Sequence, residues 1–479
     1  MSPGAPLKAL SRRLNKRRAT WCLVPPITRT LPSFIPRPYS TYSAQPPPEL
    51  SSAKGALLGA LSRNLDKRRE TGRILEIPDP VAQANAVDFG SNDVLSISTG
   101  LLREELFREL EDHPDFAVGS RGSRVLDGNS RYVTGLEAHL AQSHNAKDAL
   151  LFNSGYEANI AIWTTIPQPG DVIVYDELVH ASIHDGIKGT RTTQVFSFQH
   201  NNPASFEEVL RSIKTCHPEI AQGSRTLFVA MESVYSVDGD ICPVHQFVNS
   251  AKEILPFADR VFMIDESHSC GMIGPMGLGL VCHYGLENEF ALRLHTFGKA
   301  IGCTGAALFC DPVIKHTLFN YARNFIFTTG PTFMVLAAVK AAHRIIGGAE
   351  GDLRRERVQK NISHFYDCLQ SHPQWETFYQ TGRLRIVEED WRLHRFRTAV
   401  TPLITQPGES RALQAQLLKD GFLVHALQYP IVPLDSERLR IMLHADNTPQ
   451  QVESFVEAIM RWARQRYYPP RSCKLCDAA

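Results

Sequence analysis

Short apolar runs alternate with longer, mixed stretches between residues 145 and 310. Runs of this length and composition are typical of strands buried on both faces, and the segments between them have helical character. Strands separated by helices predict a mostly parallel sheet covered on both sides, which is an α/β fold. The predicted strands are ALLFN (149–153), DVIVYD (171–176), QVFSF (194–198), TLFVAMES (226–233), RVFMIDES (260–267) and AALFC (306–310).

The pattern changes on both sides of this region. Leu57, Leu61 and Leu65 recur at every fourth residue and predict an amphipathic helix that ends near Gly72. A helical run over 334–347 leads into a more mixed region. We therefore predict a disordered leader or presequence (1–48), an N-terminal helix and segment (49–95), a large domain (96–335), a smaller C-terminal α+β domain (336–470) and a tail (471–479).

The bulk composition is that of an ordinary globular protein. Hydrophobic residues make up 43% and charged residues 21%, and the formal net charge of +1 predicts neither nucleic acid nor an anionic membrane as a partner. No apolar run reaches the roughly 18 residues of a membrane span. The 10 cysteines lack the spacing of a secreted disulfide scaffold, and a lone C-K-L-C (473–476) is weak evidence for a metal, so no metal site is predicted.

The first part of the chain has a composition of its own. Glu49 is the first acidic residue, whereas lysine and arginine recur before it among serine and threonine. This composition fits a mitochondrial presequence, and several prolines favour the alternative of a leader without an address. We expect a mitochondrial or cytoplasmic location and favour the mitochondrial one.

Polar side chains follow the predicted strands. In an open parallel sheet, ligands bind outside the carboxyl ends of the strands, so chemistry is expected at these positions. The residues are Asn153 to Tyr156, Asp176 with His180, Glu232 with Ser236, Asp265 with His268, and Thr296 with Lys299.

Lys299 and Asp265 carry the strongest chemical implication. Lys299 stands in H-T-F-G-K-A-I-G (295–302), between apolar segments, where a hydrated charge is unfavourable unless it is paired or held as a Schiff base. Asp265 follows the apolar run VFMI, and a buried carboxylate needs a cationic partner such as a protonated pyridine nitrogen. The alternatives are an exposed loop lysine and a helix-capping aspartate.

The segment N-S-G-Y-E-A-N (153–159) passes from a strand into a helix with small residues at the turn. Free backbone N–H groups and the helix dipole at such a turn would hold a phosphate. Many α/β turns look similar, so this signal is weak by itself.

Six motifs, in their order along the chain, carry a family resemblance. Together they resemble the α-oxoamine synthases, which include 8-amino-7-oxononanoate synthase, 2-amino-3-ketobutyrate CoA ligase, 5-aminolaevulinate synthase and serine palmitoyltransferase. The resemblance spans about 85–460 and is strongest to the 8-amino-7-oxononanoate synthase branch. The motifs are G-S-R-G-S-R (119–124), S-G-Y-E-A-N (154–159), D-E-L-V-H-A-S (176–182), E-S-V-Y-S-V-D-G-D (232–240), D-E-S-H-S-C-G (265–271) and H-T-F-G-K (295–299).

The resemblance implies pyridoxal 5'-phosphate as the cofactor and a type I fold, with a large, mostly parallel domain and a smaller C-terminal α+β domain. Lys299 would hold the cofactor as a Schiff base and shuttle a proton, Asp265 would pair with the pyridine nitrogen, and His180 would stack on the ring. The alternative for His180 is a satisfied core histidine.

The resemblance also implies the remaining contacts. Ser236 and His268 would contact the phenolic oxygen of the cofactor, and Arg440 would bind the amino-acid carboxylate with help from Asn92. A turn serine and an exposed strand arginine are the alternatives for Ser236 and Arg440. The amides of Gly155 and Tyr156, together with Thr296, would hold the phosphate.

The chain departs from the family pattern at several positions. The usual S-N-D-Y-L-G reads S-N-D-V-L-S (91–96), a family histidine is Val133, Arg121 stands where glycine is common, and P-L-D-S-E (433–437) lacks the usual glycine. These positions could reshape the acyl or thioester pocket, which leaves the substrate open.

The implied reaction joins an amino acid, with alanine favoured, to an acyl thioester of CoA or a carrier protein, with loss of carbon dioxide. A homodimer is expected by analogy. One alternative is an oxoamine synthase of secondary metabolism that takes a polyketide or long acyl chain. Another is a non-catalytic partner subunit, against which Lys299 argues because such subunits lack the lysine.

Overall fold

The computed structural model describes residues 55–75, 77–387, 391–393 and 396–468. The chain divides into two compact units, 1–77 and 78–479. The described part of the first unit contains the helix α1 (Ala56–Glu70), which confirms the helix predicted to end near Gly72. The predicted leader (1–48) and tail (471–479), with its C-K-L-C pair, lie outside the described residues.

The second unit is built around a seven-stranded sheet with the order β2-β8-β7-β6-β5-β3-β4. Strands β3 to β7 run parallel to one another, and β8 runs antiparallel to both of its neighbours. The predicted α/β fold with a mostly parallel sheet is therefore confirmed. The strands are β2 (Asp148–Phe152), β3 (Val172–Asp176), β4 (Gln194–Phe198), β5 (Thr226–Glu232), β6 (Asp259–Asp265), β7 (Leu292–Thr296) and β8 (Ala306–Cys310).

Strand β7 has no apolar run and is the strand of this sheet that the hydrophobic pattern missed. Its sequence LRLHT places Arg293 and His295 among leucines, although all of its residues are buried. Burial is tolerated because Arg293 Nη2 donates to the carbonyl of His144 at 2.8 Å and His295 Nε2 lies 2.9 Å from Glu266 Oε2. Paired polar side chains in a central strand cannot be recognised from local hydrophobicity.

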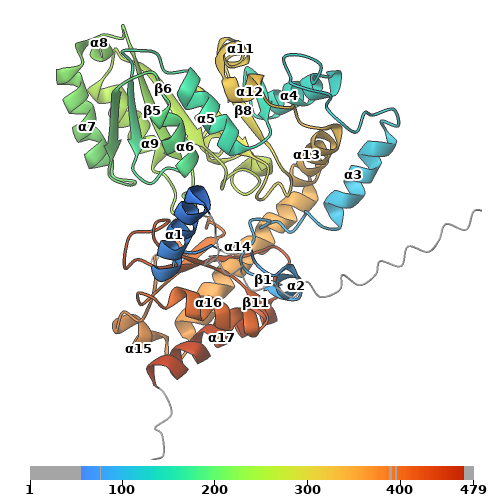
Figure 1. Cartoon of the computed structure of the whole chain (residues 1–479), viewed down its shortest axis with the longest axis vertical. Helices are drawn as coiled ribbons and strands as arrows, with labels where there is room; N and C mark the ends of the chain where they lie inside the picture. The colour runs from blue at the N-terminus through green and yellow to red at the C-terminus, as the bar shows by residue number, and fades with distance from the viewer. Residues whose placement is uncertain (1–54, 76, 388–390, 394–395, 469–479) are drawn as a thin grey trace, which may run out of the picture. The chain divides into compact units, whose positions relative to one another are not determined.

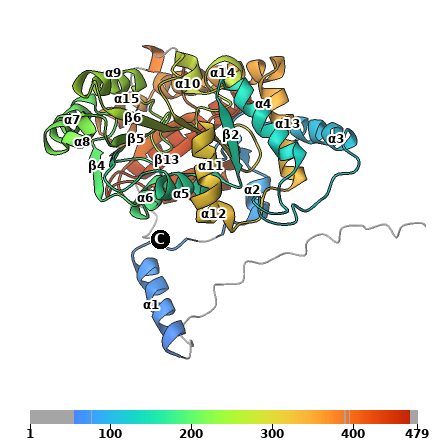
Figure 2. The ribbon, with the colours of Figure 1, turned by 90° about the horizontal axis from the view of Figure 1, so that it is seen from above.

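Helices cover both faces of this sheet, as parallel strands require. In Figure 2, α5, α6 and α11 lie on one side of the sheet and α9 and α10 on the other. Figure 1 shows the same elements from a perpendicular direction. The helices up to residue 346 are α2 (Pro80–Ala84), α3 (Leu101–Glu111), α4 (Arg131–Ser143), α5 (Gly155–Thr165), α6 (Ala181–Lys188), α7 (Pro203–Cys216), α8 (Pro218–Ala221), α9 (Val244–Ile254), α10 (Leu280–Tyr284), α11 (Pro312–Tyr321), α12 (Arg323–Ile326) and α13 (Phe333–Ile346).

A second, four-stranded antiparallel sheet follows, with the order β12-β13-β10-β9. The short strand β1 (Val87–Asp88) pairs in parallel with β11 (Phe422–Leu423), so the segment before the large sheet joins the C-terminal region. Phe89 and Phe455 stack there with ring centroids 4.1 Å apart. The remaining elements are β9 (Leu384–Ile386), β10 (Val400–Thr405), β12 (His425–Leu427), β13 (Arg438–Met442), α14 (Ala349–Ser371), α15 (Trp375–Gln380), α16 (Ser410–Lys419) and α17 (Pro449–Tyr467).

This C-terminal region mixes helices and strands, as expected, and α13 coincides with the helical run predicted over 334–347. The domain boundaries at 95, 335 and 470 stay predictions. Within the described residues, none of the helices combines the length and apolar character that crossing a membrane requires.

Three of the departures from the family pattern lie on unusual backbone. Ser96, Arg121 and Asp435 have φ values of 52°, 70° and 62°, in the left-handed region that favours glycine. Ser96 and Arg121 are the positions where the family pattern has glycine, and Asp435 lies in the segment that lacks its usual glycine. The chain therefore keeps the backbone conformation that a glycine would adopt and bears its steric cost.

Replacing Arg121 by glycine should relieve this cost. Arg121 is exposed, so the side chain itself contributes little, and a left-handed L-residue costs roughly 1–2 kcal/mol, partly offset by the greater entropy of glycine in the unfolded chain. We expect Arg121→Gly to exceed Arg121→Ala in stability by about 1 kcal/mol in chemical denaturation. Equal stabilities of the two variants would contradict the strain.

Candidate active site

A cavity of about 360 Å³ lies at the carboxyl ends of the central strands, within the second unit. Its wall includes all the residues predicted from the sequence, brought together from segments more than 300 residues apart. A larger cavity of about 970 Å³, lined by residues from 112–139 and 331–340, contains none of them. The predicted residues in the wall are Asn92, Gly155, Tyr156, His180, Ser236, Asp265, His268, Thr296, Lys299 and Arg440.

Asp265 ends β6 and is only 5% exposed. Its Oδ1 accepts hydrogen bonds from the backbone N–H and the hydroxyl of Ser267, at 2.9 and 2.5 Å. Its Oδ2 accepts one from Asn159 Nδ2 at 3.0 Å. The alternative of a capping aspartate therefore accounts for Oδ1 only. Oδ2 accepts its hydrogen bond from Asn159 of α5, at the cavity wall. Such a carboxylate is ready for a cationic partner.

Lys299 follows β7 by a short turn and is half-buried at the same cavity. Its Nζ donates to Thr296 Oγ1 at a long 3.4 Å. The alternative of an exposed loop lysine is therefore wrong for Lys299. A lysine amine whose one hydrogen bond within the described residues is this long is available to bind a ligand covalently.

The N-terminus of α5 forms a tight corner of the cavity. Ser154 caps the helix by accepting a hydrogen bond from the Glu157 N–H, which leaves the N–H groups of Gly155 and Tyr156 at the cavity wall. A side chain at Gly155 would collide with the Thr296 methyl group. Free first-turn amides at a helix N-terminus beside a threonine hydroxyl suit a phosphate.

Arg440 enters the cavity from β13 and is half-buried. Its Nη2 lies 3.5 Å from Asn92 Oδ1, and its Nε is buried without a hydrogen-bond partner in the described part of the chain. Desolvation lowers the pKa of Arg440 from its usual value. A buried guanidinium with unused donors is a site for a carboxylate ligand, and the exposed-strand alternative is wrong.

His180 caps α6 and stands exposed at the cavity wall, so it is not a core histidine. Its backbone N–H donates to Glu232 Oε1 at 2.5 Å. Complete burial, with the neighbouring Asp265 charge, raises the pKa of Glu232 well above its usual value. Burial, then the Lys299 charge, lowers the pKa of His268 well below its usual value. Burial therefore favours the uncharged forms of Glu232 and His268.

Ser236 lies in a turn, as its alternative supposed, but this turn borders the cavity. The further residues in the wall include four that were given no individual role from the sequence: Asn159, Ser182, Glu232 and Ser267. All four are buried. They lie inside the quoted motifs, yet spacing alone does not reveal which of these side chains point at the cavity.

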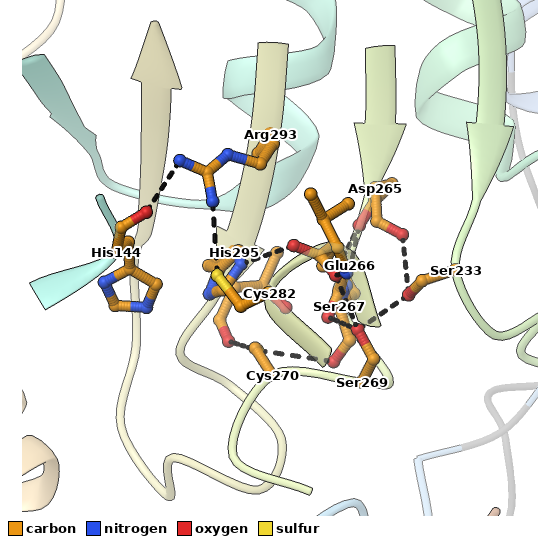
Figure 3. Close-up of polar contacts among 12 residues, drawn as sticks. His144, Ser233, Asp265, Glu266, Ser267, Ser269, Cys270, Cys282, Arg293 and His295 are labelled. Atoms are coloured by element: carbon orange, nitrogen blue, oxygen red, sulfur yellow. Dashed lines mark hydrogen bonds and ion pairs between the residues drawn. The ribbon is translucent and has the colours of Figure 1, made fainter. Parts of the chain in front are cut away.

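A buried polar network supports the strand ends that carry Asp265 and Thr296. Figure 3 shows Glu266 between His295 and the serines of the following turn. Glu266 Oε1 accepts from the Val281 N–H at 3.0 Å and from Ser269 Oγ at 3.2 Å. Although burial opposes it, the His295 hydrogen bond helps to lower the pKa of Glu266. The network keeps the loop after β6 closely packed.

Comparisons with known proteins identify relatives over most of the chain. A model of the aminotransferase class I and II family matches residues 84–459. The aminoacyl transferase sphA of Aspergillus fumigatus is 39% identical over 85% of this chain and 87% of its own length. The 8-amino-7-oxononanoate synthase of Emericella nidulans is 36% identical over 83% of this chain and 94% of its own length.

Solved structures share the fold. A serine palmitoyltransferase from S. paucimobilis has a TM-score of 0.71 at 23% identity and covers 86% of this chain and 99% of its own. An 8-amino-7-oxononanoate synthase from Francisella tularensis has a TM-score of 0.60 at 24% identity, over 80% of this chain and 99% of its own. The chain belongs to the aminotransferase class I and II family and is an enzyme of its α-oxoamine synthase group, whose cofactor is pyridoxal phosphate.

The residues present fit this cofactor. Lys299 offers an amine, Asp265 a buried carboxylate, and the first turn of α5 a phosphate cradle in the same cavity. The individual roles of the predicted residues stay predictions. Across the residues that the structure describes, no group of three or more His, Cys, Asp or Glu is placed to hold a metal ion.

Lys299→Ala should abolish turnover and covalent attachment of the cofactor. Loss of a proton-transferring group alone costs roughly 10²–10⁴-fold in rate, and loss of the covalent anchor adds to this. Borohydride reduction followed by peptide mapping should place the label on Lys299 in the wild type. Lys360→Ala, whose side chain is 71% exposed, is the control. A label on another lysine would overturn the assignment.

Proposed function

We propose that this enzyme condenses L-alanine with an acyl thioester, releasing carbon dioxide and the thiol and giving an α-amino ketone. The observation that carries the proposal is the meeting of Lys299, Asp265 and Arg440 in one cavity. Arg440 and Asn92 would bind the carboxylate of the amino acid, and Lys299 would take the proton from its α-carbon. When bound, pyridoxal phosphate supplies the electron sink for this carbanion chemistry.

A small recess beside the cavity supports alanine as the amino acid. It has a volume of about 10 Å³ and adjoins Asn92 and Lys299, where the carboxylate and the amine of the substrate would be held. A space of this size admits one methyl group or one water molecule. Its apolar wall consists of Val94, Val234, Met272, Ala300, Ala399, Val400 and Met442.

The two hydroxyl groups of this recess have partners of their own. Ser267 Oγ donates to Asp265 at 2.5 Å, and Thr398 Oγ1 donates to the carbonyl of Gly239 at 2.7 Å. A serine hydroxyl entering the recess would meet a mostly apolar wall, and a glycine substrate would leave the recess empty. Both differences favour alanine as the substrate. Over glycine the preference is set by the burial of one methyl group, and over serine by the burial of one poorly paired hydroxyl.

The acyl chain is the open part of the proposal. A pimeloyl thioester would make the enzyme an 8-amino-7-oxononanoate synthase, in line with the relative from Emericella nidulans. The second candidate, an oxoamine synthase of secondary metabolism with a longer or polyketide chain, is favoured by the similarity to two aminoacyl transferases sphA, at 39% and 38% identity. We further propose a homodimer and, from the leader composition, a mitochondrial location.

A substrate screen tests the proposal directly. Carbon dioxide release should be highest with alanine and roughly 10- to 100-fold lower in kcat/KM with glycine or serine. Each amino acid is paired with pimeloyl-CoA and with C14–C18 acyl-CoA thioesters to separate the two candidates. Preference for serine over alanine would contradict the role of the recess, and no amino ketone with any pair would contradict the reaction.

Arg440→Ala should weaken the binding of alanine by about 2–5 kcal/mol, because a buried carboxylate would lose its partner. Binding is measured by titration of the cofactor absorbance. Ethylamine has the amine and the methyl group of alanine without the carboxylate, and its binding should be unchanged in the variant. Equal losses for alanine and ethylamine would assign Arg440 a purely structural role.

A further inference from the structure

A continuous chain of buried hydrogen bonds joins Asp265 to His180. Asn159 Nδ2 donates to Asp265 Oδ2 at 3.0 Å and to Ser182 Oγ at 2.9 Å. Ser182 Oγ lies 2.7 Å from His180 Nδ1. Asn159 is 1% exposed, Ser182 0% and Asp265 5%. Water therefore has little access to the middle of this chain.

The direction of each hydrogen bond follows from the donors available. An ionised carboxylate only accepts, so Asn159 must turn its NH₂ group toward Asp265. The second hydrogen of this NH₂ group is donated to Ser182 Oγ. The Oδ1 of Asn159 is buried and has no hydrogen-bond partner among the described residues. Asp265 therefore holds the amide in this orientation. The hydrogen bond to Asp265 leaves Oδ1 as the amide atom without a partner.

The same logic fixes the imidazole. Because Ser182 Oγ accepts from Asn159, its single hydrogen is free to point to His180 Nδ1. The backbone N–H of Ser182 also donates to this Nδ1, at 3.2 Å. Two donors converge on Nδ1, so this nitrogen carries no proton and the proton of the neutral ring resides on Nε2.

We propose that Asn159 and Ser182 are positioning residues that transmit the charge of Asp265 to His180 and hold its imidazole as the Nε2–H tautomer. The carboxylate orients the amide, the amide orients the hydroxyl, and the hydroxyl selects the tautomer. Nε2 then presents a hydrogen-bond donor to the cavity. The catalytic use of this donor rests on the proposed function, whereas the tautomer itself does not.

Helix capping alone would explain part of this geometry. The Ser182 N–H bond to Nδ1 makes His180 the N-cap of α6, and this bond needs no hydroxyl and no asparagine. The two explanations differ in what the side chains of Ser182 and Asn159 contribute. Removing the hydroxyl of Ser182 keeps the backbone cap of α6 but breaks the chain of hydrogen bonds from Asp265 to His180.

The tautomer is measurable in the histidine ring nitrogens. Protein labelled with ¹⁵N at histidine is compared with His180→Gln, which identifies the His180 signals. In the wild type, with and without pyridoxal phosphate, we expect one protonated nitrogen at Nε2 and one unprotonated nitrogen at Nδ1. A neutral hydrogen bond corresponds to a roughly fivefold ratio, so Ser182→Ala and Asn159→Ala should each lower the Nε2–H to Nδ1–H ratio about fivefold.

Conservative variants separate positioning from folding. Ser182→Thr keeps the hydroxyl and should restore the wild-type ratio. Asn159→Asp puts an acceptor against Asp265 and should lower the ratio as Asn159→Ala does. If Ser182→Ala unfolds, the Asn159 pair still decides the matter, and the melting temperature of each variant identifies such a failure.

An Nε2–H population unchanged in both Ser182→Ala and Asn159→Ala would overturn the proposal and leave capping as the whole explanation. The outcome is independent of the substrate. A protein that makes no amino ketone but shows the tautomer shift would refute the proposed function and retain the positioning role. The reverse result would refute only the positioning role.

Discussion

The active site depends on one electrostatic constraint, the charge of a carboxylate buried at the end of β6. The carboxylate of Asp265 receives hydrogen bonds from Ser267 and Asn159 and forms no ion pair with a described lysine, arginine or histidine. Glu232 stands opposite Asp265 in the strand register, and burial raises the pKa of Glu232 well above its usual value. The wall of the cavity therefore presents the carboxylate of Asp265 at this edge of the sheet, and a cationic ring is the ligand that this carboxylate suits.

Neighbouring residues at the strand ends have different roles: some face the cavity, and others stabilise the loop beside it. Side chains alternate between the two faces of a strand, so Asp265 and Thr296 face the cavity while Glu266 and His295 pair with each other at 2.9 Å. Gly279 approaches Glu266 so closely that a Cβ would lie 2.6 Å from Oε1. The loop that carries His268 thus rests on the buried, hydrogen-bonded side chains of Glu266 and His295, which add no group to the cavity.

Most of the site could be predicted because the sheet brings strand ends together. Asp265 ends a predicted strand and His180 follows one, and the rule for parallel sheets was sufficient to place both at one edge. Lys299 was singled out by its position between apolar segments. Strand β7 was missed because Arg293 and His295 break its apolar run. Asn159 and Ser182 were missed because each lies in the first turns of a helix, where the sequence does not show which side chain points inward.

The positions of the departures from the family pattern indicate which part of the site they affect. None replaces a group at the strand ends, which agrees with unchanged chemistry. Val94 stands where the family pattern has tyrosine, and it lines the small recess beside Lys299. A tyrosine is much larger than a valine, so the shape of this recess depends on the exchange at position 94. Ser96, two residues later, keeps the left-handed backbone of the glycine it replaces. The segment that holds Asn92 can therefore vary in its side chains while its path stays fixed, and substrate choice can change without disturbing the bond-forming groups.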